Sequence, residues 1–111
     1  MNKVVGIFLS IFLVAVTLSW DAPTTNEDGS PLTDLAGYKL YCGPSVNNYL
    51  PIKDVGGVLE YPVSNDLADG VHHCVVTAYD TSGNESNYSD EVVFPLDRVG
   101  PGAPTNLRLR F

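Results

Sequence analysis

The stretch GYKLYC, residues 37–42, decides the fold, because its side chains alternate in the way that a half-buried β-strand requires. A second stretch, HHCVVTAY at residues 72–79, repeats this period of two. The side chains expected to point inward are Tyr38, Leu40 and Cys42 on the first stretch, and His72, Cys74, Val76 and Ala78 on the second. Lys39 and Tyr41 then fall on the outer face of the first stretch. Two such strands predict a sheet that covers a core with one face.

Shorter runs of the same kind lie on both sides of these two stretches. The expected strands, in chain order, are residues 16–20, 37–42, 49–55, 58–64, 72–79 and 91–96. Stretches rich in Pro, Asn, Asp and Gly separate them, and the one at residues 21–34 contains an Asp28-Gly29 turn. Pro51 places the third strand at an edge, since proline has no amide proton for a central ladder. About six to seven strands without a helical period predict an all-β antiparallel sandwich.

Length and charge limit the range of functions. At 111 residues the chain has room for one domain, and its formal net charge is −7. All thirteen acidic residues lie in residues 21–97 against two lysines, whereas the tail at residues 98–111 has three arginines and no acid. The acidic body repels nucleic acid and anionic membrane surfaces, so neither is an expected partner. The opposite sign of the tail favours its lying against an acidic body, its own or a neighbour's.

The N-terminus has the pattern of an export signal. Lys3 precedes an unbroken run of apolar or small residues at positions 4–16, which is shorter than the ~20 residues of a membrane-spanning helix. We therefore expect residues 1–15 to be a signal peptide, or a membrane anchor where the segment is not cut. This predicts a secreted, periplasmic or cell-surface protein, attached to a membrane only through an uncleaved N-terminal segment.

Four segments together resemble the fibronectin type III family in its bacterial form. They are VTLSWDAP at residues 16–23, DLAGYKLYCG at 34–43, SNDLADG at 64–70 and VVTAYDTSGNESNYSDEV at 75–92. They look like strand B, strand C, the corner between strands E and F, and strands F and G of that family. The resemblance implies an immunoglobulin-like β-sandwich over residues 16–97, in a family of binding and spacer modules without catalytic machinery.

The sequence departs from the family pattern in three places. No strand A precedes residue 16, and His72 or His73 stands where the family has a tyrosine at the start of strand F. Residues 102–109, after strand G, resemble the strand A that opens a following domain. We therefore expect residues 98–111 to form a basic, strand-like tail.

Cys42 and Cys74 are expected to form a disulfide. In the sandwich that the resemblance implies, strands C and F are antiparallel neighbours, and pairing Leu40 with Val76 sets the two cysteines opposite each other. An exported protein meets the oxidising conditions in which such a bond persists. The bond would close a loop of about thirty residues and stabilise the fold by on the order of 3 kcal/mol. The alternative is two buried free thiols that pack as small apolar groups.

No residue pattern in the sequence predicts catalysis or a cofactor. His72 and His73 are adjacent on a strand and point to opposite faces, so they cannot bind one metal ion together. The loop at residues 80–85 contains oxygen ligands but lacks the spacing of a calcium loop, and a turn stabilised by Asp and Asn side chains explains it. There is no GxSxG motif and no phosphate-binding glycine loop. We expect a protein that is not an enzyme and that binds no metal or cofactor.

Exposed tyrosines and the tail are the candidate interaction sites. The candidate binding surface consists of Tyr41, Tyr79, Tyr88, Asp80 and Asn84. Ordinary cross-strand packing is the alternative interpretation of the three tyrosines. The candidate strand donor, in which apolar and basic side chains alternate, consists of Leu107, Arg108, Leu109 and Arg110.

Three functions fit these features. The first is an exported, non-enzymatic binding or spacer module that contacts an extracellular protein or polysaccharide, through the loops at residues 21–34 and 80–88 or through the outer tyrosines. The second is a structural subunit that self-associates by donating its C-terminal strand to the open edge of a neighbour. The third is an accessory module of a secreted enzyme system. The tail could instead pair within its own module or stay unpaired.

Overall fold

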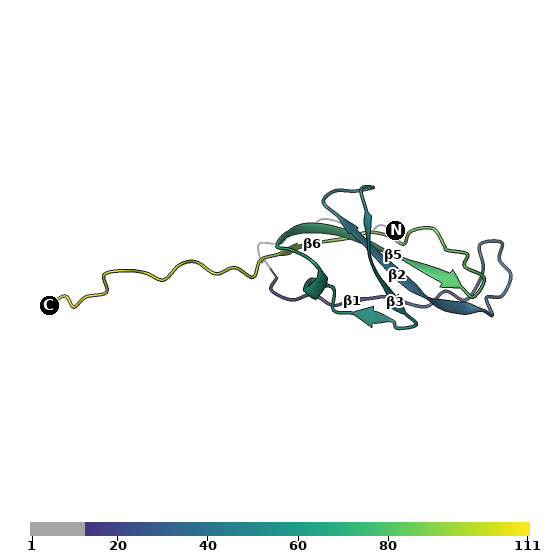
Figure 1. The fold of residues 1–111 in the computed structure, drawn as a ribbon, viewed down its shortest axis with the longest axis horizontal. Helices are drawn as coiled ribbons and strands as arrows, with labels where there is room; N and C mark the ends of the chain where they lie inside the picture. The colour runs from purple at the N-terminus through teal and green to yellow at the C-terminus, as the bar shows by residue number, and fades with distance from the viewer. Residues whose placement is uncertain (1–12) are drawn as a thin grey trace.

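A computed structural model describes residues 13–111, which form six β-strands and one short 3-10 helix (Figure 1). The strands are β1 (Leu18–Ser19), β2 (Leu35–Gly43), β3 (Leu50–Gly56), β4 (Glu60–Tyr61), β5 (Gly70–Asp80) and β6 (Val92–Leu96), and the 3-10 helix is η1 (Val63–Asp66). The all-β class predicted from the sequence is confirmed. Within residues 13–111 no helix is long and apolar enough to cross a membrane. Most of the expected signal segment lies outside the described residues.

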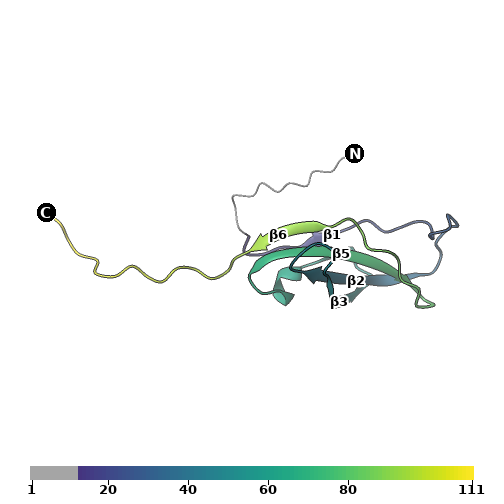
Figure 2. The ribbon, with the colours of Figure 1, turned by 90° about the horizontal axis from the view of Figure 1, so that it is seen from above.

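The strands form two antiparallel sheets that pack as two layers (Figure 2). The larger sheet has the order β3-β2-β5-β6, so β3 is an edge strand as predicted, and β1 pairs with β4 in the smaller sheet. The centre of the core between the layers consists of Leu40, Cys42, Val63, Cys74 and Phe94. Side chains from the smaller layer and its flanks pack against this centre, among them Val16, Leu18, Trp20 and Tyr61.

The inward face predicted for β2 is confirmed, and that predicted for β5 is confirmed only in part, because its outward residues Val75 and Thr77 are buried as well. Tyr38, Leu40 and Cys42 are buried in β2. In β5, Cys74 is buried and Val76 packs against the core. Full burial of an apolar side chain of this size contributes about 1.5–3 kcal/mol relative to exposure, so these residues hold the larger sheet against the smaller one.

A disulfide joins the two central strands, as predicted. In the β2–β5 ladder, Leu40 lies opposite Val76 and Cys42 lies opposite Cys74. The Cα atoms of the two cysteines are 4.1 Å apart, and the residues are separated by 32 positions in the sequence. The described part of the chain has no free cysteine.

The strand predicted at residues 58–64 is wrong over most of its length. Only Glu60–Tyr61 joins a ladder, and η1 follows directly. Pro62 has no amide proton, so a regular ladder does not continue through it. The chain turns there instead and buries two successive residues, Val63 and Ser64. The turn predicted after this strand therefore begins earlier, inside η1, and the expectation of no helical turn is corrected at this point.

The first strand is shorter than the predicted residues 16–20, although its alternation is confirmed. Only Leu18–Ser19 forms a ladder, but the N–H of Trp20 donates to the C=O of Leu59 at 3.0 Å beyond it. The predicted inward side chains of this run are half-buried and pack on the core, and they are Val16, Leu18 and Trp20.

The strand registers define two poles of the body. Gly70 at the start of β5 pairs with Leu96 at the end of β6, and Leu13 forms a parallel bridge to the same Leu96. The start of β2 pairs with the end of β5 at the far side. The described chain therefore enters and leaves the body at one end, the terminal pole (Figure 1). The long loops that precede β2 and follow β5 lie at the opposite end, the loop pole.

Candidate functional site

Three tyrosines form an exposed aromatic cluster on the outer face of the larger sheet. Tyr41 comes from β2, Tyr49 precedes β3, and Tyr88 comes from the segment between β5 and β6. The centre of the Tyr88 ring lies 5.2 Å from that of Tyr41 and 5.2 Å from that of Tyr49, edge-on to both. Tyr88 is 51% exposed, so this tyrosine cluster presents one ring to solvent and supports it with two others.

Carboxylates fix the hydroxyl groups of two of these rings. The hydroxyls of Tyr41 and Thr77 both donate to Glu85, the second at 2.7 Å. The hydroxyl of Tyr49 donates to Glu91 Oε2 at 2.7 Å. The hydrogen bond to Glu85 raises the pKa of Tyr41 to about 12, and the same bond lowers the pKa of Glu85. The rings are therefore held in place before any partner binds, which reduces the entropy lost on binding.

Charged groups flank the tyrosine cluster on both sides. Lys39 Nζ lies 3.8 Å from Glu85 Oε1 and 5.2 Å from the centre of the Tyr79 ring. His73 Nδ1 lies 3.2 Å from Glu91 Oε1. Each carboxylate that orients the cluster thus has a basic neighbour, and the face carries no excess of positive charge.

The structure brings together two of the tyrosines predicted as a binding surface, Tyr41 and Tyr88. Tyr79 lies apart from them, and its hydroxyl donates to Asp54 Oδ1 at 2.8 Å. Tyr49 takes the third place in the cluster, and the sequence analysis missed it. Its position at the start of the strand that pairs with β2 was a signal that could have found it, because cross-strand neighbours on one face contact each other.

Asp80 and Asn84, the other two residues of the predicted binding surface, shape a turn. Asp80 Oδ1 accepts hydrogen bonds from the N–H groups of Ser82 and Asn84 at 3.0 and 2.9 Å, and Asp80 Oδ2 accepts one from Asn84 Nδ2 at 3.0 Å. These bonds, those from Asn84 first, lower the pKa of Asp80. The oxygen-rich loop is therefore explained by its own turn, and these two residues do not join the tyrosine cluster.

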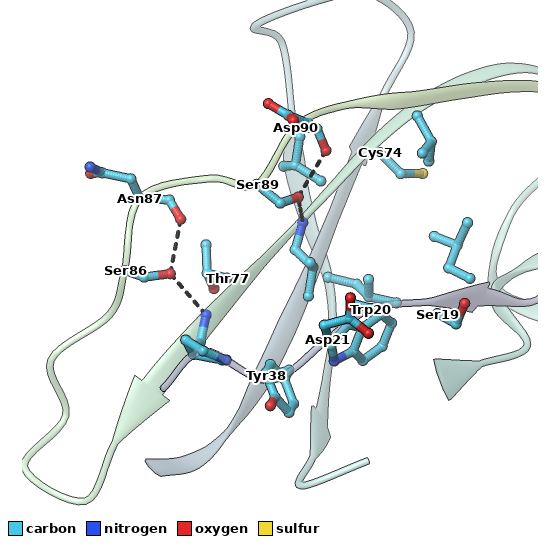
Figure 3. A pocket seen from close by; sticks show the side chains of 17 residues that line it. Ser19, Trp20, Asp21, Tyr38, Cys74, Thr77, Ser86, Asn87, Ser89 and Asp90 are labelled. Atoms are coloured by element: carbon cyan, nitrogen blue, oxygen red, sulfur yellow. Dashed lines mark hydrogen bonds between the residues drawn. The ribbon is translucent and has the colours of Figure 1, made fainter. Parts of the chain in front are cut away.

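Two serines set the position of Tyr88 between them. The N–H of Ser86 donates to the C=O of Ala78 at 2.8 Å, and the N–H of Ala78 donates back to Ser86 Oγ at 3.0 Å. Ser89 forms the same pair of bonds with Val76, at 3.0 and 2.9 Å (Figure 3). Between these two pairs, two residues of this segment thus lie opposite one residue of β5, which is the geometry of a β-bulge. Tyr88, inside the bulge, reaches the other tyrosines of the outer face.

A groove of about 590 Å³ lies between β1 and the segment at residues 86–92. The apolar side chains that line it are Leu18, Trp20, Tyr38, Leu40, Val76 and Val92. Asp21 and Asp90 also line it, whereas no described lysine, arginine or histidine does. Figure 3 shows the two serines of the bulge on one wall and Trp20 on the other. We refer to this hollow as the edge groove.

A second hollow, of about 580 Å³, lies at the loop pole between the loops at residues 21–34 and 80–86. The N–H of Thr81 donates to the C=O of Asp34 at 3.0 Å and ties the two loops together. The two loops expected to contact a partner are therefore neighbours. The charged side chains that line the hollow are all acidic, and they are Glu27, Asp28, Asp34, Asp80 and Glu85.

The two histidines lie on opposite faces of β5, as expected. The ring of His72 lies 5.9 Å from the ring of Phe94, and its Nε2 is 2.6 Å from the C=O of Ala68. His73 contacts Glu91 on the outer face. Among residues 13–111, no group of three or more His, Cys, Asp or Glu side chains is arranged to hold a metal ion.

The tail begins at a set of contacts around Arg98, the Arg98 clamp. Its Nε lies 2.9 Å from Asp69 Oδ1, and its guanidinium also donates to the C=O of Ser64, at 2.6 Å, and to that of Leu67. The sequence analysis treated Arg98 only as a charge of the tail. Beyond the clamp the chain runs away from the body and joins no strand (Figure 1). The residues predicted as a strand donor are exposed there, and they are Leu107, Arg108, Leu109 and Arg110.

No family model, curated protein or solved structure matches this chain.

Proposed function

We propose that this chain is an exported, non-enzymatic binding module with a fibronectin type III-like sandwich. The sheet order β3-β2-β5-β6 opposite β1-β4 supports that fold, because strands C, F and G of such sandwiches are neighbours in one sheet and strand B lies in the other. The segments that resemble the family fall on β1, β2, the turn before β5, and the β5–β6 hairpin. The disulfide between β2 and β5 supports an oxidising compartment.

The observation that carries the proposed function is the tyrosine cluster. A tyrosine offers a large ring and a hydroxyl with little side-chain entropy to lose, and tyrosines are enriched where proteins bind partners. The ring that solvent reaches, Tyr88, is supported by Tyr41 and Tyr49, whose hydroxyls are bonded to carboxylates. Such a preformed surface fits the flat face of a sugar ring or a shallow patch on a protein.

The charge of the body restricts the partner. Thirteen acidic residues and two lysines in residues 21–97 repel nucleic acid and anionic membranes. The partner that fits is a neutral polysaccharide, or a neutral to basic protein at the cell surface or outside the cell.

Binding of the full chain to a panel of neutral polysaccharides and cell-surface proteins tests the proposal. We expect at least one of them to be retained, and Tyr88→Ala to weaken that binding about tenfold or more, as truncation of a central interface ring does. Leu59→Ala is the matched control, because Leu59 is 48% exposed beside β4, on the opposite layer. Equal weakening by both variants, or no binding to any member of the panel, refutes the proposal.

Export is part of the proposal and is supported by Lys3 and the apolar run at residues 4–16. Leu13 packs against the core and its C=O accepts a hydrogen bond from the N–H of Asp97 at 2.8 Å, so a cut after Ala15 removes this contact. Mass spectrometry of the exported chain separates the two forms: a start at Val16 indicates a secreted protein, and an intact N-terminus a membrane-attached one. Retention of the whole chain in the cytoplasm contradicts the proposal.

A further inference from the structure

The edges of the two sheets differ in how well they are closed to an additional strand. β3, at one edge of the larger sheet, contains Pro51 and has two register shifts against β2. The other edge of that sheet, β6, is preceded by the bulge between Ser86 and Ser89. Both features oppose the regular pairing that an added strand needs. The edge of β1, by contrast, borders the edge groove.

The outer edge of β1 has backbone groups available for a further strand. The N–H of Trp20 donates to the C=O of Leu59 on the β4 side, and backbone groups in an antiparallel ladder alternate between its two sides. The N–H and C=O of Ser19 therefore point away from β4, to the side of the edge groove. No described residue forms a backbone hydrogen bond with Ser19 on that side.

The edge groove also contains a buried polar atom without a partner. Trp20 Nε1 is buried and has no hydrogen-bond acceptor among the described residues. A buried donor that lacks an acceptor destabilises the folded state. The indole ring itself lines the groove, so a peptide segment bound there would contact Trp20.

The tail has the sequence and the exposure of a strand that lacks a partner. Leu107 and Leu109 are 100% and 80% exposed and alternate with Arg108 and Arg110. The edge groove is apolar, is flanked by two aspartates, and has no lysine, arginine or histidine in its described lining. The leucines of the tail can therefore contact the apolar lining of the groove. Its arginines can lie near the aspartates that flank the groove, whose charge is opposite.

We propose that the edge groove binds the tail of a second copy of this chain as an additional strand, antiparallel to β1. In this arrangement Leu107 and Leu109 enter the groove, while Arg108 and Arg110 lie on the outer face near Asp21. The backbone of the tail bonds to Ser19 and extends the smaller sheet from two strands to three.

The tail of the same chain does not reach the groove in this direction. An antiparallel strand enters from the loop pole, whereas the Arg98 clamp holds the start of the tail at the terminal pole. The body between the poles, followed along residues 86–96, is roughly 33 Å long at ~3.3 Å per residue. Residues 97–104 span at most about 26 Å. The donor is therefore a second copy.

Trp20 makes a direct test available, because it is the single tryptophan of the chain and it lines the groove. The acceptor is the full chain with Leu107→Asp and Leu109→Asp, which disables its own tail. A synthetic peptide of residues 102–111 contains no tyrosine or tryptophan, so a change in fluorescence reports the groove. We expect a saturable change on adding this peptide, and none with a peptide that carries the same two aspartates.

Two lysine substitutions in the acceptor locate the binding site. Val92 and Val71 are similarly exposed, at 48% and 54%, but only Val92 lines the groove. We expect Val92→Lys to weaken peptide binding about tenfold or more, because it adds bulk and repels the arginines, and Val71→Lys to leave binding unchanged. Circular dichroism shows whether both variants keep the fold of the acceptor.

Light scattering of the full chain supplies an independent readout. The unmodified chain should associate as its concentration rises, and the variant with Leu107→Asp and Leu109→Asp should remain monomeric. A monomeric unmodified chain overturns the proposal whether or not the peptide changes the Trp20 signal, and so does peptide binding that Val92→Lys leaves intact.

Discussion

Reduction of the Cys42–Cys74 disulfide is the perturbation whose effect follows most directly from the structure. The bond joins two directly opposed residues of neighbouring strands, so the ladder around it holds the sulfur atoms together when the bond is broken. The folded state therefore changes little. Reduction acts mainly on the unfolded chain, because opening the loop raises the conformational entropy of the unfolded state.

The size of this effect follows from the length of the loop. A sequence separation of 32 corresponds to about 12 cal/mol/K of unfolded-chain entropy, which is about 3.7 kcal/mol at 25 °C. Small domains are stable by only about 5–15 kcal/mol, so reduction removes a large share of the free energy of unfolding. With a urea m-value of about 1 kcal/mol/M, the midpoint of unfolding should fall by roughly 3–4 M.

Urea unfolding followed by Trp20 fluorescence measures this midpoint with and without a reducing agent. The Cys42→Ala/Cys74→Ala variant is the control, because a reducing agent should leave its midpoint where it is. That midpoint should lie at or below the midpoint of the reduced natural chain, since both sulfur atoms are buried. A shift on reduction equivalent to less than about 1 kcal/mol would contradict the loop-entropy argument. Free thiols in the oxidised protein would contradict the pairing itself.

Three further predictions concern individual contacts. Gly43→Ala should destabilise the protein by about 2–3 kcal/mol in the same urea assay, because its Cβ would overlap the carbonyl of Asn48. Gly57→Ala, whose Cβ meets only ordinary contact, should change stability by less than about 1 kcal/mol, and equal effects of the two would refute the steric argument. Tyr41, with its pKa raised to about 12 by the hydrogen bond to a carboxylate, should add a late component to the ultraviolet titration that Tyr41→Phe removes. Because an unfolded tyrosine ionises near pH 10, the stabilisation from this bond is present below about pH 10 and is lost as the pH rises toward 12. Arg98→Ala should lower stability by about 1–2 kcal/mol, since it removes the hydrogen bonds that the guanidinium donates to two carbonyls. The same variant should speed proteolysis at the base of the tail, and an unchanged rate would contradict the clamp.

The central part of the fold could be predicted because alternation and chemistry agree there. Tyr38, Leu40 and Cys42 share one face at a spacing of two, and a slip of one residue would turn all three to solvent. The same constraint acts on the facing strand, so only one register buries both apolar sets. That register placed Cys42 opposite Cys74.

The segment around Pro62 could not be predicted by alternation. Tyr61 and Val63 are two residues apart, which is the spacing of neighbours on one face of a strand. This spacing is the same whether the chain continues as a strand or turns at Pro62. The turn depends on Ser64, whose Oγ accepts a hydrogen bond from the N–H of Val16, 48 positions earlier in the chain. A contact over that distance leaves no local pattern.

The tyrosine cluster could be predicted only in part. Alternation gives the outward direction of Tyr41, but the residues that meet it depend on the register shifts between β2 and β3 and on the bulge around Tyr88. Neither feature produces a periodic pattern in the sequence. The sequence analysis therefore assigned Tyr79 to the binding surface, whereas Tyr49 is the tyrosine that joins the cluster. The Arg98 clamp was missed for the same reason, since its partners include carbonyl groups of a turn.

In the membrane-attached form, which keeps Leu13, the bridge between Leu13 and Leu96 has a mechanical consequence. Whatever is joined to either end of residues 13–96 is attached at one side of the body, so the two long loops are presented at the greatest distance from the attachment. A force applied between the two ends would act on this bridge and on the Arg98 clamp. This force would not act directly on β2 and β5, so the two strands joined by the disulfide would carry the least load. The two ends would detach from the body before the sheets separated.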